Sequence, residues 1–90
     1  MTSPGAIEAS VRAIIHDVSR QDTTGIGRDN DLVEVLGVDS LQGLQVLAGV
    51  EKRFDIRLPD EELIRMRTIG RIADAVDAAL RRQNETEQVL

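Results

Sequence analysis

Three stretches of this 90-residue chain carry apolar residues every three or four positions, and this spacing limits the fold more than any other feature. It places the apolar side chains on one face of an α-helix, and that face must be buried against another element. No stretch alternates apolar and polar residues as a half-buried strand does. The sequence therefore predicts an all-α protein.

The first predicted helix follows Ser3, a good capping residue, and has Pro4 in its first turn. Its apolar positions are Ile7, Val11, Ile14, Ile15 and Val18. A second helix is expected to begin at Asp39 or Ser40 and to end near Phe54, because Pro59 forbids its continuation. The last helix is expected to follow Thr68, with apolar positions Ile69, Ile72, Ala73, Val76 and Leu80.

Shorter elements are predicted between these helices. Residues 21–30 are polar and contain glycine, which indicates a long surface loop of the kind that is often functional or mobile. The apolar run between Asp31 and Gly37 predicts a short helical turn, and the acids after Pro59 predict a short third helix over 60–66. We expect a four-helix bundle of three longer helices and a short third one, with a domain over residues 1–82 and a frayed polar tail over 83–90.

The composition excludes several classes of function. A net charge of −5, a single Phe and no Trp or Tyr leave no basic or stacking surface for nucleic acid. The absence of Cys excludes disulfides, thiolate metal sites and a cysteine nucleophile. No apolar run reaches the roughly 18 residues of a membrane span, and no basic, hydrophobic leader begins the chain. We expect a cytoplasmic protein that is a monomer.

Candidates for catalysis or metal binding are few. His16 is the single histidine, and we interpret it as an exposed side chain on the polar side of the first helix. Asp60, Glu61 and Glu62 could loosely hold a hard cation, but acids are favoured at a helix N-terminus without any metal. We predict no catalytic residue and no metal site.

The most informative segment is Leu36-Gly37-Val38-Asp39-Ser40-Leu41. It places a hydroxyl at a helix N-terminus, where backbone N–H groups without helical partners would lie near an attached phosphodiester. The same residues also suit a plain helix cap, with Ser40 or Asp39 as the capping residue. Local physics leaves both interpretations open.

This segment resembles the phosphopantetheine attachment motif of acyl carrier proteins, whose pattern is Leu-Gly-x-Asp-Ser-Leu. A second similarity, to the family's Ile/Leu-Pro-Asp-Glu-Glu start of helix three, lies at Leu58-Pro59-Asp60-Glu61-Glu62, and the resemblance covers about residues 5–82. It implies an acyl-carrier-type bundle with 4′-phosphopantetheine on Ser40, flanked by Asp39 and Leu41, whose thiol holds acyl groups as thioesters. It also implies that the chain is not an enzyme and that its partners are a phosphopantetheinyl transferase and enzymes of the ketosynthase, acyltransferase or ligase type.

The second predicted helix has two distinct faces. Its core arc consists of Gly43, Val46, Leu47, Val50 and Phe54. The neighbouring arc begins at Ser40 and contains the residues that we predict to contact partner enzymes, since the family uses this helix for recognition: Leu41, Leu44, Ala48, Glu51 and Asp55. We interpret Leu44 as part of an apolar contact and Glu51 as a solvated charge at its rim. The acids at 29, 31, 34 and 60–62 suit a basic enzyme surface.

The chain departs from housekeeping carriers, which usually have acids where it has Gln42 and Gln45, and often where it has Lys52 and Arg53. These departures favour a dedicated pathway, such as polyketide synthesis, over bulk fatty-acid synthesis. Two alternatives remain: an aminoacyl, peptidyl or D-alanyl carrier, and an unmodified helical interaction module. Asp39 argues mildly against the peptidyl kind, in which Gly-Gly-His/Asp-Ser is usual.

Gly43 lies in the core arc, three residues after the attachment site. A glycine inside a helix costs about 1 kcal/mol relative to alanine, so a local reason for it is expected. Another backbone segment could pack closely against it. The missing side chain could instead open a gap between this helix and the predicted third helix, in which an acyl chain lies among Val46, Leu47, Val50, Ile64 and Ile69.

Overall fold

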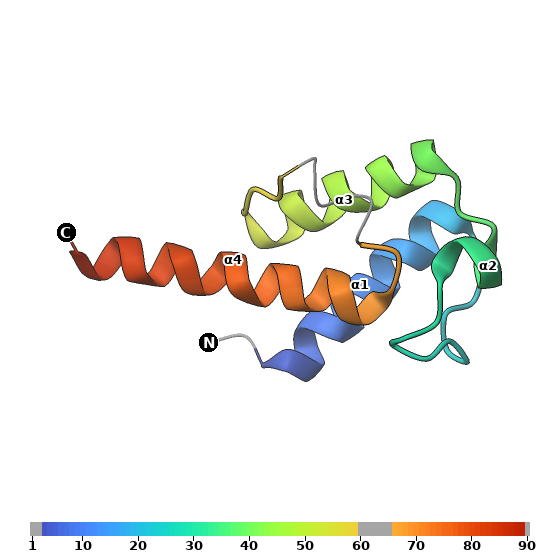
Figure 1. Cartoon of the computed structure of the whole chain (residues 1–90), viewed down its shortest axis with the longest axis horizontal. Coiled ribbons are helices and arrows are strands. Elements are labelled where there is room, and N and C mark those ends of the chain that lie inside the picture. Colours follow the sequence, from blue (N-terminus) through green and yellow to red (C-terminus); the bar gives the residue numbers. More distant parts are fainter. Residues whose placement is uncertain (1–2, 60–65, 90) are drawn as a thin grey trace.

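The computed structural model describes residues 3–59 and 66–89, and this part of the chain contains four helices and no strand. The helices are α1 (Pro4–Ser19), α2 (Leu32–Leu36), α3 (Ser40–Phe54) and α4 (Ile69–Val89). Helix α1 contacts both α3 and α4, and α2 lies at the end of the bundle where α3 begins (Figure 1). The prediction of an all-α, acyl-carrier-type bundle is confirmed.

The core comes from the apolar faces that the spacing predicted. Helix α1 buries Ile7, Val11 and Ile15, while Ile14 and Val18 are partly buried beside them. The buried residues of α3 are Val46, Leu47 and Val50, and those of α4 are Ile69, Ile72, Ala73, Val76 and Ala79. Ser3 caps α1 as predicted, because its Oγ accepts a hydrogen bond from the Ala6 N–H at 3.2 Å. The three long helices therefore follow from local pattern.

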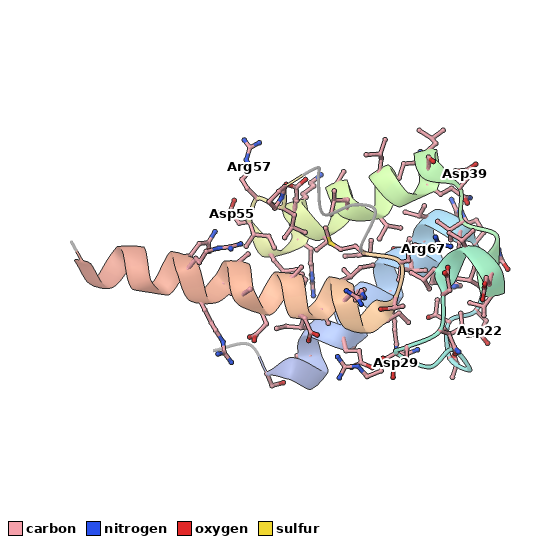
Figure 2. All side chains as sticks on the ribbon, viewed as in Figure 1. Asp22, Asp29, Asp39, Asp55, Arg57 and Arg67 are labelled. Carbon is pink, nitrogen blue, oxygen red and sulfur yellow. The ribbon has the colours of Figure 1, made fainter. Side chains whose placement is uncertain are left out.

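Helix α4 is longer than the sequence predicted. The apolar stripe ends at Leu80 and a frayed tail was expected from Gln83, but the helix continues to Val89 and projects beyond the other helices (Figure 1). Residues 81–89 contain no Gly or Pro and are rich in Arg, Gln and Glu, which form helices well. Gln83 also donates a hydrogen bond to the Asp55 carbonyl at 2.6 Å, and Asp55 lies beside α4 (Figure 2). The domain boundary at residue 82 stays a prediction.

The two predicted short helices have different outcomes. The apolar run after Asp31 forms α2, which Asp31 caps by accepting a hydrogen bond from the Val33 N–H at 2.9 Å. The short helix predicted over 60–66 lies outside the described residues except for Met66, which is buried but not helical. The only short helix that the described part of the chain contains therefore precedes α3.

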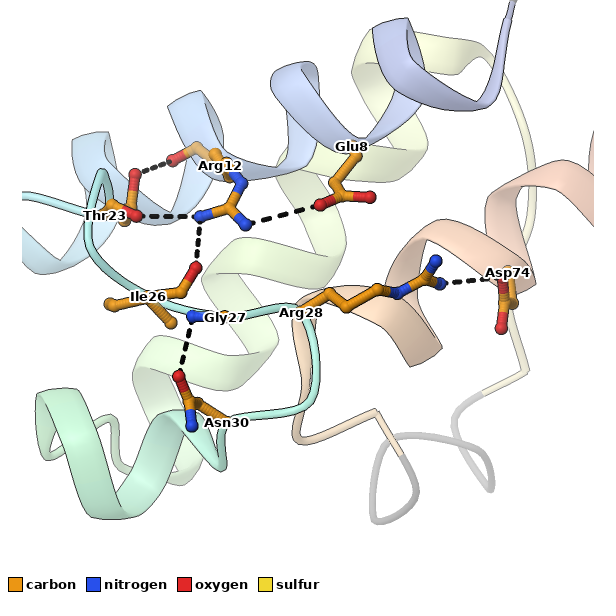
Figure 3. A network of polar contacts seen from close by, with 8 residues as sticks. All are labelled: Glu8, Arg12, Thr23, Ile26, Gly27, Arg28, Asn30 and Asp74. Carbon is orange, nitrogen blue, oxygen red and sulfur yellow. Dashed lines mark hydrogen bonds and ion pairs between the residues drawn. The ribbon is translucent and has the colours of Figure 1, made fainter.

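The loop over 21–30 is held to α1 by a partly buried network of hydrogen bonds around Arg12 (Figure 3). The Arg12 guanidinium donates hydrogen bonds to the Thr23 and Ile26 carbonyls at 2.8 and 2.6 Å, and it pairs with Glu8 at 3.3 Å. Thr23 is buried, and its hydroxyl donates to the Arg12 carbonyl at 3.4 Å. The stretch is therefore a surface loop, as predicted, but it is anchored to α1, because a single arginine satisfies its inward-facing carbonyls.

Candidate functional site

The start of α3 is built by the three residues before Ser40. Gly37 ends α2 in the left-handed region, with φ of 68°, and its N–H donates to the Val33 carbonyl at 3.0 Å. Val38 is then buried in the core, and Asp39 adopts the extended conformation of a capping residue. A glycine accepts this positive φ without the strain of a side chain. The chain thus turns sharply and presents Ser40 as the first residue of α3.

Asp39, rather than Ser40, caps the helix. Its Oδ1 accepts a hydrogen bond from the Gln42 N–H at 2.8 Å, and the Gln42 Oε1 accepts one from the Asp39 N–H at 3.4 Å. This reciprocal pair is a capping box. The sequence contains its signature, an Asp followed three residues later by Gln, but Gln42 was considered only as a missing acid. The capping role left open between two residues is now assigned to Asp39.

The Ser40 hydroxyl is therefore not needed by the helix. Ser40 is exposed, and its side chain has no hydrogen-bond partner among residues 3–59 and 66–89. Asp39 occupies the N–H groups of Gln42 and, through its carbonyl, of Gly43 at 2.9 Å. The backbone N–H groups of Ser40 and Leu41 remain at the positive end of the helix dipole. The position suits an anionic group attached to Ser40.

A cavity of about 440 Å³ lies beside Ser40. Its wall includes Leu32 of α2, Val46 and Leu47 of α3, and Met66, and its volume falls within the roughly 300–1,000 Å³ typical of small-molecule sites. Gly43 also lines it, and a Cβ built there would meet no atom of residues 3–59 and 66–89 within 4 Å. Among these residues no backbone segment packs closely against Gly43, and its missing side chain borders the cavity. Of the residues predicted to surround a cargo, Val46 and Leu47 line the cavity and Val50 and Ile69 do not, while Ile64 lies outside the described residues.

The predicted partner face is exposed over its apolar half. Leu41 and Leu44 are 64% and 47% exposed, and Ala48 is also exposed. The structure adds Val33 and Val35 of α2, which are 45% and 46% exposed. These two valines could have been expected from the sequence, because a five-residue helix with four apolar residues cannot bury all of them. Large exposed apolar side chains therefore lie on both helices that meet at Ser40, which is where partner contacts are expected.

The two acids predicted for this face have structural roles. Glu51 is half-buried, and its Oε2 accepts a hydrogen bond from the Leu58 N–H at 2.9 Å. Asp55 ends α3 in the left-handed region, with φ of 54°. The interpretation of Glu51 as a solvated rim charge is wrong, because its carboxylate holds the chain that follows α3. Asp55 lies at the opposite end of α3 from Asp39 (Figure 2).

The other candidates for catalysis or metal binding are His16 and the acids at 60–62. His16 is exposed as predicted, with Nδ1 2.8 Å from the Gln21 carbonyl oxygen. Residues 60–62, the loose acidic cluster, lie outside the described residues. Across residues 3–59 and 66–89, no group of three His, Cys, Asp or Glu side chains could hold a metal ion. Over the same residues, none of the helices has both the length and the apolar character needed to cross a membrane.

Comparison with known proteins identifies the family. The family profile described as a phosphopantetheine attachment site matches residues 9–76. The acyl carrier protein of Akkermansia muciniphila is 31% identical over 75 residues, which are 83% of this chain and 94% of that protein. The chain belongs to the acyl carrier protein family. A further relative, the acyl carrier protein of Clostridium acetobutylicum, is 32% identical over 68 residues, covering 76% of this chain and 88% of that protein.

Acyl carrier proteins bear a covalent 4′-phosphopantetheine, and they are carriers rather than catalysts. The cofactor and the family predicted from Leu36–Leu41 are confirmed. The described residues fit the group: an exposed hydroxyl that the helix does not use stands at a helix N-terminus and borders an apolar cavity. When bound, the group supplies the thiol that this cysteine-free carrier lacks.

Proposed function

We propose that this chain is a free-standing acyl carrier, not itself an enzyme, that bears its 4′-phosphopantetheine on Ser40. The observation that carries the proposal is that residues other than Ser40 cap the start of α3. Asp39 and Gln42 form the capping box, so that the exposed Ser40 hydroxyl is left for a phosphopantetheinyl transferase. Leu41, the residue after Ser40, is exposed, so the surface beside the hydroxyl is apolar. The cytoplasmic location and the monomeric state stay predictions.

The cargo is an acyl intermediate of a dedicated pathway, such as polyketide synthesis, rather than of bulk fatty-acid synthesis. This is supported by the neutral character of the recognition helix, where Gln45 is exposed and uncharged and where Gln42 serves the cap. Lys52 and Arg53, both exposed, add positive charge to the last turn of α3. An aminoacyl or peptidyl cargo is the alternative, since the carrier chemistry would be the same.

Partner enzymes of the ketosynthase, acyltransferase or ligase type dock on the apolar residues around Ser40. Leu41, Leu44 and Ala48 of α3 form this contact together with Val33 and Val35 of α2. An enzyme must receive the arm from Ser40, so its surface covers the helices that meet there. Apolar residues at the centre of such a contact contribute more binding free energy than charges at its rim.

The acyl chain shelters in the cavity beside Ser40. The support is the largely apolar wall and the open space at Gly43. Burying a chain there should raise the melting temperature of the acylated form above that of the pantetheine form. In Gly43→Val this rise should shrink, because the new side chain enters the same space.

Two serines at helix N-termini provide the test of the attachment site. Ser3 is the cap of α1, whereas Ser40 follows the cap of α3. With coenzyme A and a broadly specific phosphopantetheinyl transferase, the intact protein and Ser3→Ala should each gain one phosphopantetheine in mass. Ser40→Ala should gain none. Ser3→Ala should lose about 1 kcal/mol of stability, while Ser40→Ala should melt close to the unchanged protein.

Modification of Ser40→Ala would place the arm elsewhere. An intact protein that is never modified would favour the unmodified interaction module. A large loss of stability in Ser40→Ala would show that the hydroxyl serves the helix after all.

A further inference from the structure

Among the described residues that line the cavity beside Ser40, one carries a positive charge. Nine of these twelve residues are aliphatic, methionine or glycine, and the other three are Asp39, Ser40 and Arg67. Asp39 and Ser40 belong to the attachment site already described. Arg67, which lies 27 positions later in the chain, has no part in it.

Arg67 is held in place at α2. Its Nη2 lies 2.8 Å from Asp31 Oδ2, and its carbonyl accepts a hydrogen bond from the Leu32 N–H at 2.8 Å. The other Asp31 oxygen caps α2 by accepting the Val33 N–H. These contacts fix the backbone and one nitrogen of Arg67 next to a helix that forms part of the cavity wall.

The guanidinium retains hydrogen-bonding capacity. It has five N–H donors, and its side chain is paired only through Nη2 among residues 3–59 and 66–89. The side chain is half-exposed, so these donors are not enclosed by protein. Arg67 is also a lining residue of the cavity, so that a group that enters the cavity comes close to this side chain.

Such donors discriminate between kinds of cargo. A ketone or hydroxyl oxygen that enters an aliphatic cavity gives up its hydrogen bonds to water, which is unfavourable unless a donor replaces them. A charged donor does so strongly, since hydrogen bonds to an ionised group are about twice as strong as neutral ones. A plain alkyl chain gains nothing from the same guanidinium.

We propose that Arg67 is a specificity-determining residue that recognises an acceptor oxygen on the acyl chain, so that this carrier shelters oxygenated acyl groups in preference to plain alkyl ones. The proposal rests on the carrier function proposed above. The ligand class is a keto- or hydroxyacyl chain in which the oxygen lies beyond the thioester. The phosphate of the arm is an alternative partner for Arg67, and the experiment separates the two.

The protein is loaded from coenzyme A or its thioesters to give four forms: pantetheine, octanoyl, 3-oxooctanoyl and 5-oxooctanoyl. Melting temperatures are measured for the unchanged protein, Arg67→Met and Asp31→Asn. The unchanged protein should melt at least as high with one of the oxo chains as with octanoyl. In Arg67→Met both oxo forms should fall below the octanoyl form, by roughly 4–8 °C.

Asp31→Asn is the matched control, because it removes the same ion pair but keeps the guanidinium of Arg67, whose backbone carbonyl still accepts the Leu32 N–H. It should keep the stability of the oxo forms relative to octanoyl. Equal losses in Arg67→Met and Asp31→Asn would mean that Arg67 acts only by holding α2, and would overturn the proposal. If Arg67→Met lowers the melting temperature of the pantetheine form as much as it lowers that of the oxo forms, Arg67 binds the phosphate of the arm. This result would also overturn the proposal.

Two further results with the unchanged protein would overturn the proposal. One is a melting temperature of both oxo forms below that of the octanoyl form. The other is an octanoyl form with the same melting temperature as the pantetheine form. In these cases the carrier function would stand, since loading itself tests it by mass. A chain that accepts none of the four groups would instead refute the carrier function.

Discussion

Two glycines six residues apart on α3 have opposite surroundings. A Cβ at Gly49 would lie 2.9 Å from Cγ2 of Ile14 on α1, whereas a Cβ at Gly43 would meet no atom of the described part of the chain within 4 Å. The same residue type thus permits a close helix contact at one position and borders a cavity at the other. The difference divides the molecule into a packed region, where α1 contacts α3, α4 and the 21–30 loop, and an open region around Ser40.

The open region contains what a carrier needs. Ser40, the cavity and the exposed apolar residues of α2 and α3 all lie at this end of the bundle. The packed region stabilises the fold, which allows the open region to contain a cavity. Substitutions in the two regions should therefore have different consequences, and four predictions test this division.

The largest effect is expected for Arg12→Met in the packed region. It leaves the Thr23 and Ile26 carbonyls without their donor, and hydrogen bonds to charged groups contribute more than neutral ones. We expect a loss of about 3 kcal/mol in the free energy of unfolding, measured by urea denaturation. Arg28→Met is the control, since the Arg28–Asp74 pair is exposed and should contribute less than about 1 kcal/mol (Figure 3). Equal losses would remove the special role of Arg12.

In the open region, Leu44→Arg should impair function without loss of stability. Leu44 is exposed, so its replacement leaves the core intact, but it disrupts the apolar contact with a partner enzyme. We expect transfer to the cognate enzyme to fall at least about tenfold in kcat/KM. Glu51→Gln should have a smaller effect, because a glutamine oxygen can still accept the Leu58 N–H. The reverse order, or a steep salt dependence, would contradict apolar docking.

Replacing each of the two glycines by alanine should change the stability of the protein in opposite directions. Gly43→Ala should stabilise the protein by about 1 kcal/mol, since alanine favours the helix and its Cβ enters open space. Gly49→Ala gains the same propensity but forces a methyl group against Ile14, whose branched side chain moves little. We expect a net loss of about 1 kcal/mol after these terms are combined. Thermal melts that rise for both variants would abolish the distinction between the two regions.

The smallest effect concerns Asp22, at the exposed edge of the loop. Hydrogen bonds from the Thr24 hydroxyl and N–H, at 2.5 and 2.9 Å, lower the pKa of the Asp22 carboxyl below its ordinary value. A lowered pKa means that this contribution to stability is complete above the ordinary aspartate pKa and is lost as pH falls through the lowered one. Thr24→Val should raise the Asp22 pKa towards its ordinary value in an NMR titration. An unchanged pKa would exclude the hydroxyl as its main cause.

The sequence by itself determined the helices and the attachment motif. Helical spacing is a local property, so the faces at Ile7–Val18 and Ile69–Leu80 predicted what is buried. The motif at Leu36–Leu41 predicted the family and the cofactor, because its residues are contiguous. The role of Gln42 in the capping box could also have been predicted from the sequence, since the capping box has a local signature.

Only the tertiary structure decided the rest. The choice of Asp39 over Ser40 as the cap depended on backbone angles set by Gly37 and the buried Val38. The space at Gly43 and the place of Arg67 depended on elements that lie far apart in the chain, and a cavity is the volume that several helices leave unfilled. The role of Arg12 could not be predicted from the sequence. The carbonyls to which it donates hydrogen bonds belong to a loop whose path no local pattern specifies.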